Sequence, residues 1–154
     1  MDINLPTSKT ELINILKVMS EMYSANEASI GYVMGMWQSN LGLDDWQIEF
    51  SLQDDLEGEN ETLGFCSAVP NSKTAIIFLK KENQGKETLE DVILHELIHL
   101  MMGEYDQAVD IAFEHSNTHI GMAKMVYDSG ERTIQSIAQA FLRLRKTMEK
   151  AKNG

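Results

Sequence analysis

The stretch Val92-Ile93-Leu94-His95-Glu96-Leu97-Ile98-His99-Leu100 determines how the rest of this chain is interpreted. Its apolar side chains lie nearly all around a helical wheel, which is typical of a helix buried in a protein core. Three ionisable side chains, His95, Glu96 and His99, nevertheless lie within this apolar run. Burying such groups costs free energy unless a partner satisfies them. The stretch therefore predicts a buried helix that carries a polar site.

The spacing of the two histidines suits a shared metal ion. Residues four apart lie one turn above each other on the same face of a helix. Neutral imidazole nitrogen is a good zinc ligand, and zinc accepts the open coordination of a catalytic site. We interpret His95 and His99 as ligands of Zn2+, a spacing known from metalloproteases. The alternative is a pair of core histidines with ordinary hydrogen bonds.

Glu96 follows the first histidine and is about 100° around the helix from it. This position places the carboxylate beside the metal without making it a ligand. There it can accept a proton from a water molecule whose pKa zinc lowers to about 7. We therefore predict that Glu96 is the catalytic general base.

The segments around this helix alternate between two periodicities. Apolar residues recur at helical spacing before residue 40 and after residue 88, and they alternate with polar residues between these limits. Gly42 is a predicted helix stop, and Pro70-Asn71-Ser72-Lys73 is a predicted turn. We expect helices at 8–24, 26–40, 88–102, 106–127 and 130–150, and strands at 46–52, 62–69 and 74–79. This order predicts an α+β fold whose strands are connected by hairpins.

We expect the third metal ligand to come from one of the helices that follow. In the last helix, an apolar stripe is predicted to face the core: Ile134, Ile137, Ala138 and Phe141. Glu131 precedes Ile134 by three residues and should share this face. An inward acid needs a partner, and either a metal or the free N–H groups of the helix end would supply one. Glu131 is our first choice as third ligand.

Two further histidines, His115 and His119, fall in the apolar arc of the helix expected at 106–127. They could support the metal ligands, donate a hydrogen bond in the transition state, or supply the third ligand. Tyr105 is another candidate donor. The alternative interpretation is that both histidines are core residues bonded to backbone carbonyls.

Composition limits the class of protein and its partners. The chain has 154 residues and a formal net charge of −11, from 24 acidic and 13 basic side chains. One domain is the expectation at this length, and the acidic charge disfavours nucleic-acid binding. The basic stretch 143–152 is interpreted as the solvated face of a helix. Cys66 is the only cysteine, no apolar run suits a membrane span, and no leader is evident, so we expect a cytoplasmic protein.

The combination of the H-E-x-x-H helix with a late Glu motif resembles the small zincins of phages and bacteria. These are the SprT-like and ImmA/IrrE-like metallopeptidases, which are minimal gluzincins. The resemblance covers about residues 40–145 and is carried by the segments 46–50, 75–79, 92–100 and 131–138. It implies a zincin-like fold in which His95, His99 and Glu131 hold zinc and Glu96 is the base. The zinc ribbon or basic tail of many SprT-like members is missing.

The resemblance also implies an arrangement of parts and a mode of substrate binding. Residues 1–40 would form an N-terminal helical segment and residues 41–150 a catalytic core, within one domain. An extended peptide would pair with an edge strand beside the active helix, and we expect the strand at 74–79 to be that edge. The function expected is zinc-dependent hydrolysis of peptide bonds in a peptide or protein substrate. The alternative is a zinc-binding regulatory or interaction module with little turnover.

Overall fold

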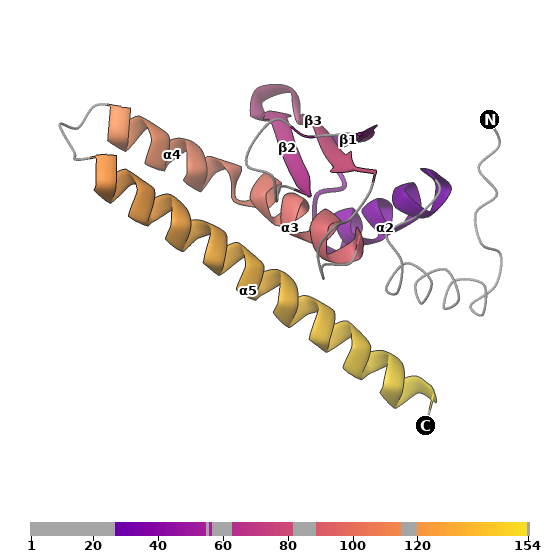
Figure 1. Ribbon diagram of the computed structural model, residues 1–154. Helices are drawn as coiled ribbons and strands as arrows, with labels where there is room; N and C mark the ends of the chain where they lie inside the picture. Colours follow the sequence, from indigo (N-terminus) through magenta and orange to yellow (C-terminus); the bar gives the residue numbers. More distant parts are fainter. Residues whose placement is uncertain (1–26, 55, 57–62, 82–88, 115–119, 154) are drawn as a thin grey trace. The chain divides into compact units, whose positions relative to one another are not determined.

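A computed structural model describes residues 27–54, 56, 63–81, 89–114 and 120–153 (Figure 1). In chain order the elements are α2 (Glu27–Asn40), β1 (Gln47–Gln53), β2 (Gly64–Val69), a 3-10 turn η1 (Pro70–Ser72), β3 (Thr74–Lys80), α3 (Leu89–Met101), α4 (Gly103–Glu114) and α5 (Ile120–Asn153). The α+β class is confirmed. The helix expected at 8–24 lies outside the described residues. The chain divides into two compact units, Met1–Leu100 and Met101–Gly154.

Helix α2 ends as its sequence predicts. Gly42 has a φ of 71°, which a residue without a Cβ adopts at little cost. The N–H of Gly42 donates to the carbonyl of Ser39, and that of Leu43 to the carbonyl of Gln38. This pair of bonds is the Schellman arrangement that closes a helix. The buried side chains of α2 are Ile30, Val33, Met34 and Trp37, so the methionine-rich part of this helix packs in the core.

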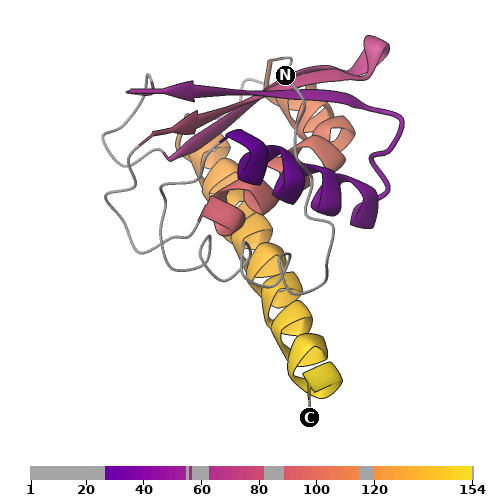
Figure 2. The ribbon, with the colours of Figure 1, turned by 90° about the vertical axis from the view of Figure 1, so that its right-hand side faces the viewer.

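The three strands form one sheet in the order β1-β3-β2. The predicted hairpin of β2 and β3 is present, and Lys73 completes its turn with a φ of 50°. The expectation that hairpins connect the whole sheet was wrong, because β1 pairs with β3 in parallel. Ile77 and Leu79 of β3 are fully buried, and a strand with such side chains gains most from the central position. Helices α2 and α3 lie on the same face of the sheet (Figure 2).

The register divides the sheet into two faces. Phe50 pairs with Ile77 and Cys66 also pairs with Ile77, so these three side chains share one face. The opposite face carries Phe65 and Phe78, whose rings stack with centroids 5.9 Å apart. The first face holds the buried side chains of β3 and is therefore the core face.

The second unit is built from α4 and α5, which run antiparallel (Figure 1). The ring of Phe113 lies 6.3 Å from that of Tyr127, and the Tyr127 hydroxyl donates to Asp110. The expected helix boundaries here were wrong. Gly103 begins α4, and α5 runs unbroken through Gly130, where nothing lies within 4 Å of the position of a Cβ. One glycine costs a helix only about 1 kcal/mol.

The apolar arc predicted for 106–127 is not buried in α4. None of the residues described in that helix is buried, and Ile111 is 51% exposed. Among the described residues, no helix combines the length and the apolar run that crossing a lipid bilayer requires.

Candidate metal centre

The two histidines of α3 lie side by side. Their Nε2 atoms are 3.1 Å apart, and their ring centroids are 4.9 Å apart. Two nitrogens bound to one tetrahedral zinc at about 2.0–2.1 Å would be separated by roughly 3.3 Å. The observed separation of the Nε2 atoms is close to this value. It is also compatible with a hydrogen bond in which one neutral ring donates to the other.

Helix α3 is buried on almost every side, as its apolar sequence predicts. Leu94, Leu97 and Ile98 are fully buried, whereas His95 and His99 are only half-buried. The apolar residues therefore fix the helix in the core, and the two histidines occupy its accessible side. A metal ion could reach them without unfolding the helix.

Glu96 is buried, with 7% of its surface exposed, and it lies against strand β2. A Cβ at Gly64 would be 3.1 Å from both Cγ and Oε1 of Glu96, and 2.6 Å from Cγ1 of Val92. Only glycine fits here without displacing these groups. Gly64 was not singled out from the sequence, although a glycine inside a strand often marks a close approach of this kind.

Cys66 lies two residues further along β2 and belongs to the core face of the sheet. Burial raises the pKa of its thiol to about 12, and the negative charge of Glu96 adds to this effect. The thiol is therefore protonated at neutral pH. A metal ion would have to displace this proton to bind the sulfur, and we do not count Cys66 among the candidate ligands.

A second buried acid, Glu90, was not singled out from the sequence. It is 2% exposed, and its Oε1 accepts a hydrogen bond of 2.9 Å from Nε1 of Trp37. This bond links α2 to the first turn of α3, one and a half turns before His95. Its donor is a neutral indole on a core helix, so we assign Glu90 a structural role.

Glu131 lies in α5 and is exposed. The prediction that an apolar row of α5 faces the core was partly wrong. Ile134 and Ala138 are buried, but the third buried residue is Leu142, while Ile137 is half-buried and Phe141 is 36% exposed. His115 and His119 lie outside the described residues, and the side chain of Tyr105 is 55% exposed.

The prediction that the strand at 74–79 lies at the edge of the sheet was wrong. That segment is β3, which has a neighbour on each side and so has no free backbone groups for a peptide. Strand β2 has one neighbour in the described sheet and lies beside Glu96 at Gly64. The strand next to the candidate site is therefore the edge strand β2.

His95 and His99 are suitable ligands for a metal ion such as zinc. Their imidazoles are half-buried, and the separation of their Nε2 atoms is close to the one that a shared ion requires. A buried carboxylate follows in the same helix turn. Comparisons with protein-family models, with curated proteins and with solved structures find no match to this chain.

Proposed function

We propose that this chain is a zinc-dependent hydrolase that cleaves peptide bonds. The observation that carries the proposal is the pairing of His95 and His99, with Nε2 atoms 3.1 Å apart, beside the buried carboxylate of Glu96. A purely structural zinc site has no need of such a carboxylate. Its presence favours catalysis.

The residues proposed to hold zinc are His95, His99 and Glu131. Each offers one ligand atom of a kind that zinc accepts, an imidazole nitrogen from each histidine and a carboxylate oxygen from the glutamate. Two His and one Glu leave a fourth position open, as in other catalytic zinc sites. When bound, zinc would supply a Lewis acid and would lower the pKa of a water molecule in that position.

Glu96 would move the proton. Its carboxylate would accept a proton from the attacking water and deliver it to the leaving amine. The side chain is held in place because α3 is fixed by its apolar residues and because Gly64 leaves room for Cγ and Oε1. A general base held in this way is oriented before the substrate binds.

Strand β2 is the proposed site of substrate pairing. An extended peptide that adds to an edge strand gains affinity from main-chain hydrogen bonds, with little demand on its sequence. The strand runs from Gly64, beside Glu96, to Val69, and Phe65 on it is 55% exposed. A peptide paired with β2 would pass close to the general base.

The test is metal analysis combined with a cleavage assay on a peptide library. We expect one zinc per chain in protein purified without chelators, and loss of this zinc in His95→Ala. Glu96→Gln should keep the zinc and lose cleavage. Absence of zinc from the wild type would refute the metal site, and cleavage that survives Glu96→Gln would refute the role of the base.

Glu131 is tested by a matched pair of substitutions. Glu131→Gln should weaken zinc binding by roughly 10- to 100-fold, whereas Glu104→Gln, at an exposed acid of α4, should leave it unchanged. Equal zinc affinity in the two variants would exclude Glu131 as a ligand. If the wild type holds zinc but cleaves nothing in the library, the regulatory zinc-binding module becomes the better description.

A further inference from the structure

One side of α5 carries an exposed row of residues without charge. The positions are spaced by three, four and four residues and repeat every 11, which keeps them in line on a nearly straight helix. We call this row the α5 stripe: Met122, Met125, Ser129, Thr133, Ser136, Ala140, Leu144, Thr147 and Ala151. All nine are exposed and none is charged, although the helix contains ten charged side chains. An exposed surface that avoids charge over the whole helix indicates a contact surface.

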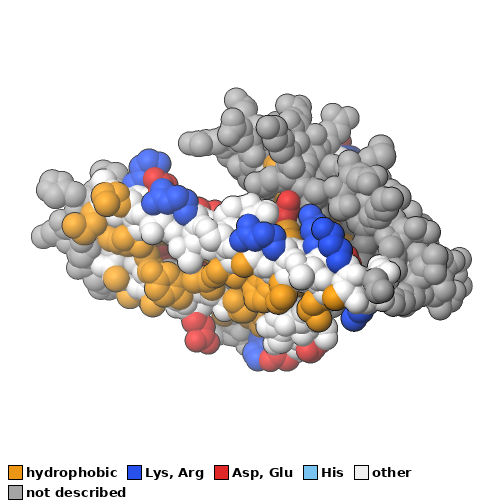
Figure 3. Space-filling view, turned by 90° about the horizontal axis from the view of Figure 1, so that it is seen from below, with side chains coloured by type: hydrophobic (Ala, Val, Ile, Leu, Met, Phe, Trp, Pro, Cys, Tyr) orange, Lys and Arg blue, Asp and Glu red, His pale blue; other side chains and the backbone are white. Residues whose placement is uncertain are grey.

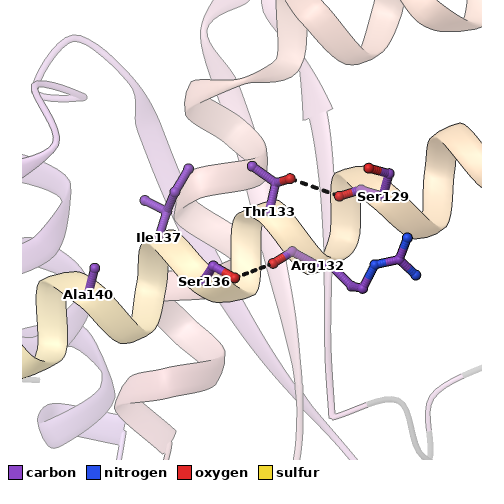
Figure 4. A pocket seen from close by; sticks show the side chains of 6 residues that line it. All are labelled: Ser129, Arg132, Thr133, Ser136, Ile137 and Ala140. Atoms are coloured by element: carbon purple, nitrogen blue, oxygen red, sulfur yellow. Dashed lines mark hydrogen bonds between the residues drawn. The ribbon is translucent and has the colours of Figure 1, made fainter.

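Three of the four hydroxyl groups of the stripe already donate a hydrogen bond within α5. Thr133, Ser136 and Thr147 each donate to the backbone carbonyl four residues earlier, at 2.9, 2.7 and 2.9 Å. Figure 4 shows the first two of these bonds, with the side chains folded back on the helix. Because these donors are already satisfied, the stripe can be covered by another protein surface at little desolvation cost.

Large side chains of the stripe flank a middle part made of small ones. Met122, Met125 and Leu144 are 58%, 71% and 57% exposed. Over the middle lies an open hollow of about 400 Å³ (Figure 4), lined by Ser129, Arg132, Thr133, Ser136, Ile137 and Ala140. Small residues at the centre let two helices approach closely. In the space-filling view, hydrophobic side chains form a band along α5, with Lys and Arg beside it (Figure 3).

This layout is self-complementary in an antiparallel sense. If a second α5 runs in the opposite direction and crosses near Ser136, Met125 meets Met148 of the other copy, an exposed residue that adjoins Thr147 of the stripe. In the same arrangement Thr133 meets Ala140, and Met122 meets Ala151. Met125 and Met148 then pack together on each side of the crossing, and the small residues meet at its centre.

The charges of the second unit favour the same orientation. Helix α4 carries four acidic and no basic side chains, a net charge of −4. From Arg143 onwards α5 carries five basic residues and one acidic residue, a net charge of +4. Helix α4 packs near Tyr127, at the other end of α5 from this basic segment. An antiparallel partner therefore brings its basic end to the same end of α5 as the acidic α4, whereas a parallel partner would place the two basic ends side by side.

We propose that two copies of this chain associate through the α5 stripe, antiparallel and crossing near Ser136. The occupant of the stripe is thus a second copy of the same helix. The interface is isologous, because the same row of residues serves both copies. It does not depend on the zinc chemistry proposed above.

Sedimentation velocity on the full chain tests the association. We expect the wild type to have about twice the chain mass of 17.4 kDa, and Ala140→Glu to sediment as a monomer, because it buries two charges at the crossing. The matched control is Ala108→Glu, at an exposed alanine of α4, which should remain dimeric. A wild type that is monomeric at every concentration, or a dimeric Ala140→Glu, overturns the proposal.

Cysteine cross-linking tests the orientation without relying on a disruptive variant. Ser136→Cys should form a disulfide with itself across the two copies, since equivalent residues near the crossing come close together. Met122→Cys alone should not, but Met122→Cys combined with Ala151→Cys should. Native Cys66 has a thiol pKa of about 12 and should not interfere. Cross-linking by Met122→Cys alone would indicate parallel helices and would overturn the proposed arrangement.

Discussion

Replacement of Gly64 by alanine tests how strand β2 and helix α3 position the general base. The new methyl group would lie 2.6 Å from Cγ1 of Val92 and 3.1 Å from Cγ and Oε1 of Glu96. Ordinary contact begins at about 3.4 Å, so the strand and Val92 must separate by about 0.8 Å. Both neighbours are buried in the packed core, and the Glu96 side chain has little room to retreat.

The expected magnitudes follow from this displacement. Overpacking of a core typically costs about 1–3 kcal/mol, and we expect the free energy of unfolding to fall by this amount. A catalytic group misplaced by about 1 Å can lower the rate by roughly 100-fold. Cleavage should therefore fall by up to this factor, while zinc content stays at the wild-type level because His95 and His99 are untouched.

Urea denaturation and the peptide cleavage assay measure the two effects separately. The matched control is Gly35→Ala in α2, where nothing lies within 4 Å of the new Cβ. It should raise stability by about 0.5–1 kcal/mol, because alanine favours a helix. Adding Val92→Ala to Gly64→Ala removes the closest contact, so the double variant should be more stable than the sum of the single changes predicts.

The double variant also separates strain from catalysis. It relieves the contact with Val92 but leaves the methyl group 3.1 Å from Glu96, so cleavage should stay low while stability partly recovers. Wild-type stability in Gly64→Ala would show that β2 and α3 are not in this contact. Loss of stability with full activity would show that the position of Glu96 does not matter for the reaction.

Three further predictions concern the first unit. Trp37→Phe removes the hydrogen bond to the buried Glu90 and should cost about 1–3 kcal/mol in urea denaturation, whereas an unchanged midpoint would refute that bond. Gly42→Ala forces a Cβ into a φ of 71° and should cost about 1 kcal/mol, unlike Gly35→Ala. At pH 8 the Cys66 thiol, with a pKa raised from 9.0 to about 12, should react with iodoacetamide roughly 1000-fold more slowly than an ordinary thiol.

The raised pKa of the Cys66 thiol also makes the stability of the protein depend on pH. Its thiol ionises near pH 9 in the unfolded chain but only near pH 12 in the folded protein. The unfolded state therefore gains ionisation free energy between these values, and stability should fall as the pH rises from about 9 towards 12. Cys66→Ala should reduce this part of the pH dependence in urea denaturation.

The sequence predicted correctly those features that depend only on neighbouring residues in the chain. Helix α3 was predicted because its apolar residues surround the whole helix, and the end of α2 because Gly42 can adopt a positive φ. The pairing of His95 with His99 follows from helical spacing alone. Each of these signals lies within about ten residues of chain.

Features that depend on distant segments were missed or predicted wrongly. The parallel pairing of β1 with β3 depends on which strand gains most from burial on both sides, and alternation within one strand does not reveal it. The unbroken α5 shows the same limit. Gly130 weakens a helix locally, but the packing of a long amphipathic helix outweighs this loss. The requirement for glycine at position 64 arises from contacts with Val92 and Glu96, which are about 30 residues away in the sequence.

The hydrogen bond between Trp37 and Glu90 sets a lower limit on the fragment that can fold by itself. A truncated chain that begins after residue 40 would lack Trp37 and would leave the Glu90 carboxylate without that donor. It would also uncover core surface now shielded by Ile30 and Val33. Any minimal version of the candidate metal centre must therefore begin before α2, even though no residue of that helix is proposed to touch metal or substrate.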